Sequence, residues 1–261
     1  MSIDPRWAVI VADGESDAAA LERAMAAPRG GDPAAPGHPA AAGHPAAPGD
    51  ATAAAPRDPP ARPLVIGADH GALRAEALGV RPDLVVGDAD SLSASELAHL
   101  RAVGVRVQLA PAAKDESDTE LCILAALGAG ATHVRLVGAL GGPRPEHAVA
   151  NLLLLGLPVL DGIDAAIVTA TSTIRRSGTS QGPGRLDLDG TPGDHVSLFA
   201  IDSVVERVRT SGLRFPLRDE PLHPGPARGL SNELLASSAT VSSSRGRLLV
   251  IHTRRSLEVH P

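Results

Sequence analysis

The stretch LVIGADHGALRAEALGVRPDLVVGDAD, residues 64–90, decides the fold class of this chain. Residues 64–67 and 83–87 are short, continuous apolar runs, which is typical of strands that are buried on both faces of a sheet. Residues 71–78, between these runs, predict a helix. Strand, helix and strand joined by short turns form the repeating unit of a parallel sheet, so the stretch predicts an α/β fold.

The same alternation continues on both sides of this stretch. Upstream, residues 7–12 predict a strand and residues 15–27 a helix. Downstream, Ser93 followed by Glu96 forms a capping box at the start of a helix. Further strands are expected at residues 105–109 and 133–137, and further helices at residues 117–127 and 145–155. We therefore expect a Rossmann-like parallel sheet with helices on both faces.

From about Ala170 the pattern changes to short alternating or β-branched runs that are divided by glycine-containing turns. These runs lie at residues 173–177, 185–188, 195–200, 204–210, 239–243 and 247–253. Such runs predict antiparallel strands in a β-sandwich or small barrel. We therefore predict two domains, residues 1–170 and 171–261.

Residues 28–63 interrupt the first predicted domain with a different composition. They consist mainly of Ala, Pro, Gly and His, and the sequence GHPAA occurs twice, at residues 37–41 and 43–47. Proline breaks both periodic structures, and the segment offers no branched apolar side chain to a core. The composition predicts a disordered insert.

The overall composition argues against several classes of protein. The chain of 261 residues has a net charge of −6, whereas a nucleic-acid-binding surface needs a basic stripe. Its single cysteine, Cys122, excludes a disulfide scaffold and is predicted to be a buried thiol. No segment reaches the roughly 18 apolar residues of a membrane span, and we recognise no charged leader. We expect a soluble, cytoplasmic protein without nucleic-acid or membrane partners.

Acidic residues follow the predicted parallel strands, at Asp13, Asp69, Asp88 and Asp90. Ligands of such sheets bind at the carboxyl ends of the strands, so these side chains are candidates for one site. Asp88 and Asp90 would point to the same side if the chain stayed extended. Converging carboxylates without His or Cys suit Mg²⁺ and a bound polyphosphate. The alternative interpretation is an acidic turn that precedes the helix capped by Ser93.

The segment KDESDTELC, residues 114–122, adds a third acidic cluster. Lys114 is the only lysine in the chain, and a compact ammonium beside carboxylates suits polyphosphate binding. Asp118, in the first turn of the predicted helix, is the natural third metal ligand. Asp115 and Glu116 have the alternative role of stabilising the helix N-terminus.

A glycine-rich segment at residues 138–142 lies between a predicted strand and a predicted helix. Its glycines would let phosphate groups approach the backbone, although it matches neither G-x-G-x-x-G nor a P-loop. Arg144, just beyond it, is either a fork-shaped phosphate donor or a solvated surface charge.

Taken together, these segments resemble the thiamine pyrophosphokinase family. That family has GADGGANR, PDLIIGDFDS, KDETDTEL and GGRxDHxxAN in this order, followed by GLKYPL and S-x-G-x-S-N-E. The similar segments of this chain are residues 67–74, 82–91, 114–121, 141–151, 212–217 and 228–233. The resemblance covers the chain apart from the insert.

The resemblance implies transfer of a pyrophosphoryl group from ATP to the hydroxyethyl oxygen of thiamine, giving thiamine diphosphate and AMP, with Mg²⁺. It implies that the metal is held by Asp88, Asp90 and Asp118. Asp69 would contact metal-bound water or the reactive end of thiamine, and either Asp69 or Asp90 would accept the alcohol proton. The nucleotide would be bound by Lys114, Asp115, Thr119, Arg144 and Glu146, and thiamine by Phe215, Ser231 and Asn232. A homodimer with the thiamine site between subunits is also implied.

Four positions depart from the family's pattern. His70 replaces a glycine, Leu73 an asparagine and Glu146 an aspartate, while Pro143 lengthens the loop by one residue. These departures motivate the alternative of a catalytically impaired protein that binds thiamine or a nucleotide without turnover. A third hypothesis is another nucleotide-dependent transferase or a dinucleotide oxidoreductase, and the oxidoreductase lacks its glycine fingerprint here.

Overall fold

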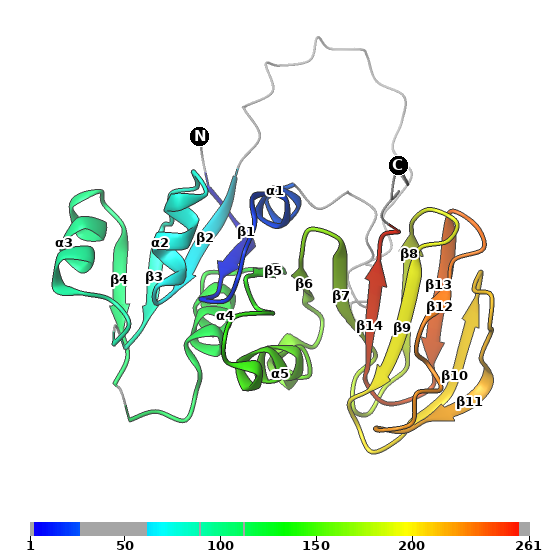
Figure 1. The fold of residues 1–261 in the computed structure, drawn as a ribbon. Coiled ribbons are helices and arrows are strands. Elements are labelled where there is room, and N and C mark those ends of the chain that lie inside the picture. The colour runs from blue at the N-terminus through cyan, green and yellow to red at the C-terminus, as the bar shows by residue number, and fades with distance from the viewer. Residues whose placement is uncertain (1–2, 27–61, 89, 112, 256–261) are drawn as a thin grey trace, which may run out of the picture.

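The computed structural model describes residues 3–26, 62–88, 90–111 and 113–255. These residues form a mixed sheet of 10 strands and a second, antiparallel sheet of 4 strands (Figure 1). Helices cover one half of the larger sheet, and the smaller sheet packs against its other half. The predicted order of an α/β part followed by a β-sandwich is confirmed.

The α/β half contains six parallel strands in the order β4-β3-β2-β1-β5-β6. They are β1 (Ile3–Val11), β2 (Arg62–Ala68), β3 (Leu84–Gly87), β4 (Arg106–Leu109), β5 (His133–Val137) and β6 (Asp164–Val168). The direction of winding reverses at β1, which lies between β2 and β5. This switch point is where an open α/β sheet normally binds its ligand.

Within the described residues, five α-helices cover both faces of the parallel strands, as predicted. They are α1 (Ala18–Met25), α2 (Gly71–Ala77), α3 (Ala94–Ala102), α4 (Asp118–Gly128) and α5 (Pro145–Leu154). Leu21 of α1 and Ala75 of α2 pack with Val9 and Val65 on one face. Ile123 of α4 packs on the opposite face. The core is made mainly of Leu, Val, Ile and Ala, in agreement with the aromatic content of only 1%.

Several elements of the α/β half begin one to four residues from their predicted start, and the difference is largest for α1 and β1. The predicted helix at residues 15–27 begins only at Ala18, because the carboxylate of Asp17 accepts the backbone N–H of Ala20 at 2.6 Å and caps the helix there. Strand β1 begins at Ile3, earlier than the apolar run indicates. The capping box of α3, formed by Ser93 and Glu96, is confirmed.

The β half extends the larger sheet with four antiparallel strands in the order β7-β14-β9-β12. These strands are β7 (Ser172–Ser177), β9 (His195–Ala200), β12 (Asn232–Glu233) and β14 (Leu248–Thr253). The smaller sheet contains β8 (Gly184–Asp189), β10 (Val205–Ser211), β11 (Arg218–Leu222) and β13 (Ser238–Ser243). Leu188, Val208 and Val241 of the smaller sheet share a core with Val196 and Val250 of the larger.

The two halves are joined without a break in the larger sheet. Strand β6 pairs with β7 in antiparallel register, from Ala166 opposite Arg175 to Val168 opposite Thr173. The domain boundary that we predict near Ala170 falls in the turn between these two strands. The division into two domains stays a prediction, because one sheet runs through both parts.

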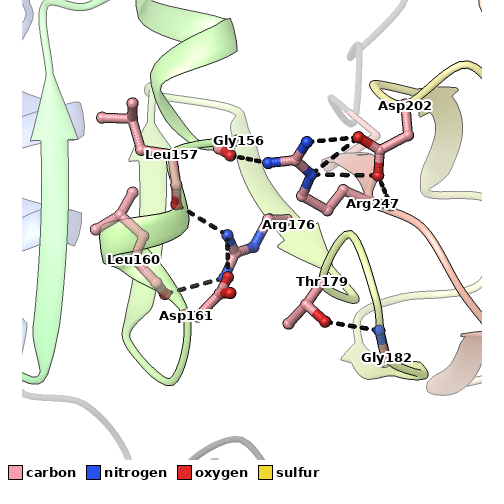
Figure 2. A network of polar contacts seen from close by, with 9 residues as sticks. All are labelled: Gly156, Leu157, Leu160, Asp161, Arg176, Thr179, Gly182, Asp202 and Arg247. Atoms are coloured by element: carbon pink, nitrogen blue, oxygen red, sulfur yellow. Dashed lines mark hydrogen bonds and ion pairs between the residues drawn. The ribbon is translucent and has the colours of Figure 1, made fainter.

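Arg176 of β7 connects the β half to the segment after α5 (Figure 2). Its guanidinium donates to the carbonyl oxygens of Leu157 at 3.2 Å and of Leu160 at 2.9 Å. Leu160 is the last residue of the short 3₁₀-helix η1 (Pro158–Leu160), and Asp161 just beyond it pairs with the same guanidinium at 2.9 Å. Because each of these oxygens also accepts a backbone N–H, from Leu160 and Ile163 respectively, the guanidinium uses their second lone pair and ties β7 to the helical segment.

Arg247, immediately before β14, makes a second connection beside the first (Figure 2). Its guanidinium donates to the carbonyl oxygen of Gly156 and makes two-pronged contacts with the carboxylate of Asp202, the shortest 2.5 Å. The Asp202 carboxyl has a lowered pKa, chiefly because of its hydrogen bond with Arg247. We call the contacts of Arg176 and Arg247 with residues 156–161 the arginine latch.

Two further sequence predictions concern the insert and the cysteine. Residues 27–61 lie outside the described residues, so the predicted disorder there stays a prediction. Arg62 and Pro63, which we assigned to the insert, belong to β2. Cys122 is a buried thiol, as predicted, and burial raises its pKa well above the usual value. Within the described part of the chain, no helix has the length and apolar character required to cross a membrane.

Candidate active site

Three carboxylates meet at the carboxyl ends of β2 and β3. Asp69 follows β2, Asp88 follows β3, and Asp118 is the first residue of α4. Each offers one carboxylate oxygen, and these three oxygens lie within 4.8 Å of one another. Asp69 is buried, with 5% of its surface exposed, while the other two are half-buried. The structure therefore brings together two of the three predicted metal ligands and adds Asp69; we call these three residues the carboxylate cluster.

The local backbone turns Asp69 into the cluster. Its φ of 48° lies in the left-handed region, which aspartate tolerates better than most residues. Its N–H donates to the carbonyl oxygen of Val86 at 3.0 Å, and the hydroxyl of Ser91 donates to its carboxylate at 3.2 Å. A Cβ atom at Gly87 would lie 2.1 Å from Asp69 Oδ1, so only glycine leaves room for this carboxylate. The sequence IGAD followed by VVGD thus encodes both the turn and the space that the turn needs.

Lys114 contributes a positive charge to the carboxylate cluster. Its Nζ lies 2.6 Å from Asp118 Oδ1 and 3.4 Å from Asp88 Oδ2, and its side chain is only 11% exposed. Burial would lower the pKa of Lys114, but the hydrogen bonds and charges of the two aspartates outweigh it and raise that pKa. The pKa of Asp88 is lowered, first by the backbone N–H of Asp90 and then by the charge of Lys114, against the effect of burial.

Asp90 is not part of the carboxylate cluster, contrary to the expectation that Asp88 and Asp90 point to one side. The chain turns at Asp90 and Ser91 instead of staying extended, and the Asp90 side chain is exposed. Its backbone N–H donates to Asp88 Oδ1 at 3.1 Å, so Asp90 holds that carboxylate in place through its main chain. The assignment of Asp90 as a metal ligand stays a prediction without geometric support.

The glycine-rich loop after β5 packs against the loop after β1. Gly138, Gly141 and Gly142 all have positive φ, and a Cβ at Gly14 would lie 2.2 Å from the carbonyl oxygen of Gly138. Asn151, buried in α5, donates from Nδ2 to the carbonyl oxygen of Ala139 at 2.8 Å and so fixes the loop to the helix. The sequence assigned no role to Asn151, although it is the last residue of the segment 141–151 that resembles the family's GGRxDHxxAN.

The remaining candidates for nucleotide binding surround this region. Arg144 precedes α5, and its Nε pairs with Glu146 Oε1 at 2.8 Å; both side chains are largely exposed. Thr119 is buried in the first turn of α4, whereas Asp115 is exposed beside Lys114. Their roles stay predictions.

The departures at His70 and Leu73 fit the local structure. His70 has φ −60° and ψ −16°, an ordinary helical conformation that does not need glycine. Its Nδ1 lies 3.3 Å from Asp13 Oδ1, which also pairs with Nε of Arg74 at 2.9 Å. Leu73 packs against the small core that contains Leu100. Neither substitution disrupts the path of the chain around the carboxylate cluster.

In β12, the edge strand of the larger sheet, the side chain of Asn232 makes hydrogen bonds with the backbone of Phe215. Its Oδ1 accepts the N–H groups of Phe215 at 3.0 Å and Glu233 at 2.9 Å, and its Nδ2 donates to the Phe215 carbonyl oxygen at 2.7 Å. The Phe215 residue is 57% exposed. Ser231 is exposed and has a left-handed φ of 57°. Most of the bonding capacity of Asn232 is therefore already used within the protein.

Comparison with known proteins assigns both parts of this arrangement. Residues 60–165 match the family model described as "Thiamin pyrophosphokinase, catalytic domain", and residues 185–248 match "Thiamin pyrophosphokinase, vitamin B1 binding domain". The chain belongs to the thiamine pyrophosphokinase family. The predicted resemblance is thereby confirmed.

Members of the thiamine pyrophosphokinase family match the chain over most of their length. The thiamine pyrophosphokinase of Bacillus subtilis (strain 168) is 25% identical over 191 residues, covering 73% of this chain and 87% of that protein. A crystal structure of the B. subtilis protein has a TM-score of 0.65 and 26% identity, covering 74% of this chain and 88% of that one. The crystal structure of the thiamin pyrophosphokinase from Geobacillus thermodenitrificans, 23% identical, shares the fold with a TM-score of 0.68 over 96% of this chain and 98% of that one.

The two thiamine pyrophosphokinase family models divide the candidate residues between them. The carboxylate cluster, Lys114 and the glycine-rich loop lie within the catalytic match. Phe215, Ser231 and Asn232 lie within the vitamin B1 binding match.

Proposed function

We propose that this protein transfers a pyrophosphoryl group from ATP to thiamine, giving thiamine diphosphate and AMP with the help of Mg²⁺. Membership of the thiamine pyrophosphokinase family supports thiamine pyrophosphorylation in general. The observation that carries the proposal is the convergence of Asp69, Asp88 and Asp118 with Lys114 at the strand ends. Such a site combines metal ligands with a cation for phosphate oxygens.

The carboxylate cluster fits a divalent cation. All of its donors are carboxylate oxygens, which Mg²⁺ prefers. The missing Cβ of Gly87 leaves the room in which Asp69 turns inward, and the ion pairs of Lys114 with Asp88 and Asp118 support a site that is suited to positive charge. Asp69, Asp88 and Asp118 would hold the ion. When bound, Mg²⁺ neutralises charge on the oxygens of the transferring group.

The chemistry that remains for the protein is positioning and one proton transfer. The alcohol oxygen of thiamine attacks the β-phosphorus of ATP, the bond from that phosphorus to the bridging α,β-oxygen breaks, and AMP leaves. Asp69 is buried next to Gly87 and Ser91, whereas Asp90 is exposed and adjoins the cluster through its backbone N–H, which donates to Asp88. We assign the alcohol proton to Asp90, because it alone of the two candidates is accessible to a substrate hydroxyl.

The nucleotide phosphates would lie between the cluster and the glycine-rich loop. Lys114 supplies a compact charge, and Arg144 supplies a planar fork after exchanging its partner Glu146 for phosphate oxygens. Thr119 and Asp115 flank the same helix start. These nucleotide-binding roles form part of the proposal.

Thiamine would bind against Phe215 and Ser231, with Asn232 holding the Phe215 backbone. Leu230 and Leu235, close to Asn232 in the sequence, are exposed apolar residues, as Phe215 is. Exposed apolar side chains in a ligand-binding region suit an interface between subunits. We therefore propose a homodimer in which the thiamine site lies between subunits.

The test is an assay of the purified chain with thiamine, ATP and Mg²⁺ that follows AMP and thiamine diphosphate together. Equimolar formation of both products supports the proposal. Asp88→Asn should abolish turnover, whereas Asp187→Asn, which removes an exposed carboxylate on β8, should leave it unchanged. Saturable thiamine binding without any AMP would refute the proposal and favour the non-catalytic alternative.

A further inference from the structure

The carboxylate cluster already contains a cation of its own. The ammonium of Lys114 contacts two of the three carboxylates, at 2.6 Å from Asp118 and 3.4 Å from Asp88. Three negative charges that lie within 4.8 Å of one another repel strongly when they are partly withdrawn from water. The ammonium offsets part of this repulsion, which explains why its own pKa is raised despite burial.

A divalent cation would change this balance. An ion that binds the carboxylates neutralises the charge that holds Lys114, and it repels the ammonium directly. Lys114 lies in the connection between β4 and α4, outside any helix or strand, and its four-carbon stem lets the charged end move. The ammonium then becomes available to a neighbouring anion, and a polyphosphate that binds the same ion provides one.

We propose that Lys114 is an internal counter-cation, which balances the carboxylate cluster before substrates bind and transfers to the nucleotide phosphates when a divalent cation enters. This inference rests on the proposed function, since it takes the cluster to be a metal site. Its consequence is a coupled entry of metal and nucleotide. The metal binds weakly alone because it displaces the ammonium, and tightly with a polyphosphate because the displaced ammonium gains a partner. By linkage, the metal strengthens nucleotide binding by the same factor.

Mn²⁺ binding to the full chain, followed by electron paramagnetic resonance without nucleotide, tests the first half of the inference. Lys114→Met keeps an unbranched side chain and removes the charge, so it should bind Mn²⁺ at least about tenfold more tightly than the wild type. Arg74→Met is the matched control, because it removes a positive charge that pairs with Asp13 outside the cluster. The control should shift Mn²⁺ affinity less than about threefold. Equal affinities in the wild type and Lys114→Met would overturn the inference.

Coupling is tested with α,β-methylene-ATP, in which the bond to be broken is blocked. The analogue should increase Mn²⁺ affinity in the wild type by a factor that is at least about tenfold larger than in Lys114→Met. Similar factors in both proteins would show that Lys114 does not link the two ligands.

A direct measurement on the unaltered protein is possible because Lys114 is the only lysine. Protein labelled with ¹⁵N-lysine has a single side-chain ammonium signal, which reports the surroundings of Nζ. This signal should shift when Mg²⁺ is added and shift again when the methylene analogue follows. A signal that stays unchanged at saturating Mg²⁺ and analogue would overturn the inference, and this experiment does not depend on the folding of a variant.

The inference and the proposed function fail in distinguishable ways. If AMP forms but the lysine signal and the Mn²⁺ affinities do not respond, the counter-cation role is wrong and the enzyme assignment stands. If the lysine signal and affinities respond as expected but no AMP forms, the catalytic proposal is wrong and the counter-cation role stands. If the wild type and Lys114→Met both fail to bind Mn²⁺, the metal site and the inference are both wrong.

Discussion

Replacing Gly87 with alanine should change the position of the Asp69 carboxylate in the cluster while leaving the stability of the fold nearly unchanged. The backbone at Gly87 does not lie in the left-handed region, so alanine is compatible with its conformation. The new Cβ would nevertheless lie 2.1 Å from Asp69 Oδ1 and 3.3 Å from Asp118 Oδ1. Since Cβ contacts below 3.0 Å are essentially never seen, Asp69 must move by about 1 Å.

A displacement of this size in a positioned group reduces turnover by about 100-fold, which corresponds to about 2.7 kcal/mol of lost transition-state stabilisation. We expect Gly87→Ala to lower kcat by that factor and to weaken Mn²⁺ binding, while the melting temperature changes little. The measurements are steady-state kinetics, Mn²⁺ binding and thermal unfolding.

Gly128→Ala provides the control for this experiment. Gly128 is the last residue of α4, and nothing lies within 4 Å of a Cβ added there. Alanine should leave turnover unchanged and stabilise the helix by up to about 1 kcal/mol. Wild-type turnover in Gly87→Ala would refute the idea that the inward position of Asp69 matters for the reaction.

Four further outcomes are expected. Arg247→Met should lower the free energy of unfolding by about 2–3 kcal/mol in denaturant titrations, because the Asp202 carboxylate and the Gly156 carbonyl oxygen lose a charged donor. A change below about 0.5 kcal/mol would show that the contacts of Arg247 contribute no more than an exposed ion pair. Because Arg247 lowers the pKa of Asp202, the stabilisation that this ion pair contributes is complete above the unfolded-state pKa of about 3.9 and is lost as the pH falls through the lower folded-state pKa. The difference in unfolding free energy between the wild type and Asp202→Asn should therefore shrink below about pH 4. A constant difference down to about pH 2 contradicts this assignment. Asn232→Asp places an oxygen opposite the Phe215 carbonyl oxygen and should raise KM for thiamine about tenfold with less than about a threefold change in kcat; an unchanged KM argues against the thiamine site there. Deleting residues 29–60 should leave kcat and KM within about twofold, and loss of folding would give the insert a structural role.

The fold was predictable because the strands of the α/β half carry their pattern locally. Residues 133–137 were predicted as a strand and form β5 with the same bounds. Strand β6 was not predicted, and β11, with the sequence RDEPL, is an edge strand whose charges and proline conceal it. The pairing of β6 with β7 was also unpredictable, because register between distant strands is a tertiary property.

The candidate site was predictable in its location and less so in its membership. Residues that follow strands were correctly expected at one edge, since parallel strands end together. The inward turn of Asp69 depends on a left-handed backbone and on the missing side chain of Gly87 on the neighbouring strand β3, and only the pairing of β2 with β3 brings the two together. Asp90 lies outside the cluster because the chain turns at Asp90 and Ser91, which is the acidic turn that the sequence offered as the alternative interpretation. Phe215, which makes two hydrogen bonds with Asn232, lies 17 positions away, so this contact follows from the packing of the β half.

The continuous ladder from β6 to β7 limits how the molecule can respond to its ligands. Rotation of the β half as a rigid body against the α/β half would have to break the backbone hydrogen bonds between β6 and β7. It would also have to break the hydrogen bonds of the Arg176 and Arg247 guanidinium groups. Adaptation to a bound substrate is therefore confined to loops and side chains at the rim. The spacing between the carboxylate cluster and Asn232 is thus set when the chain folds.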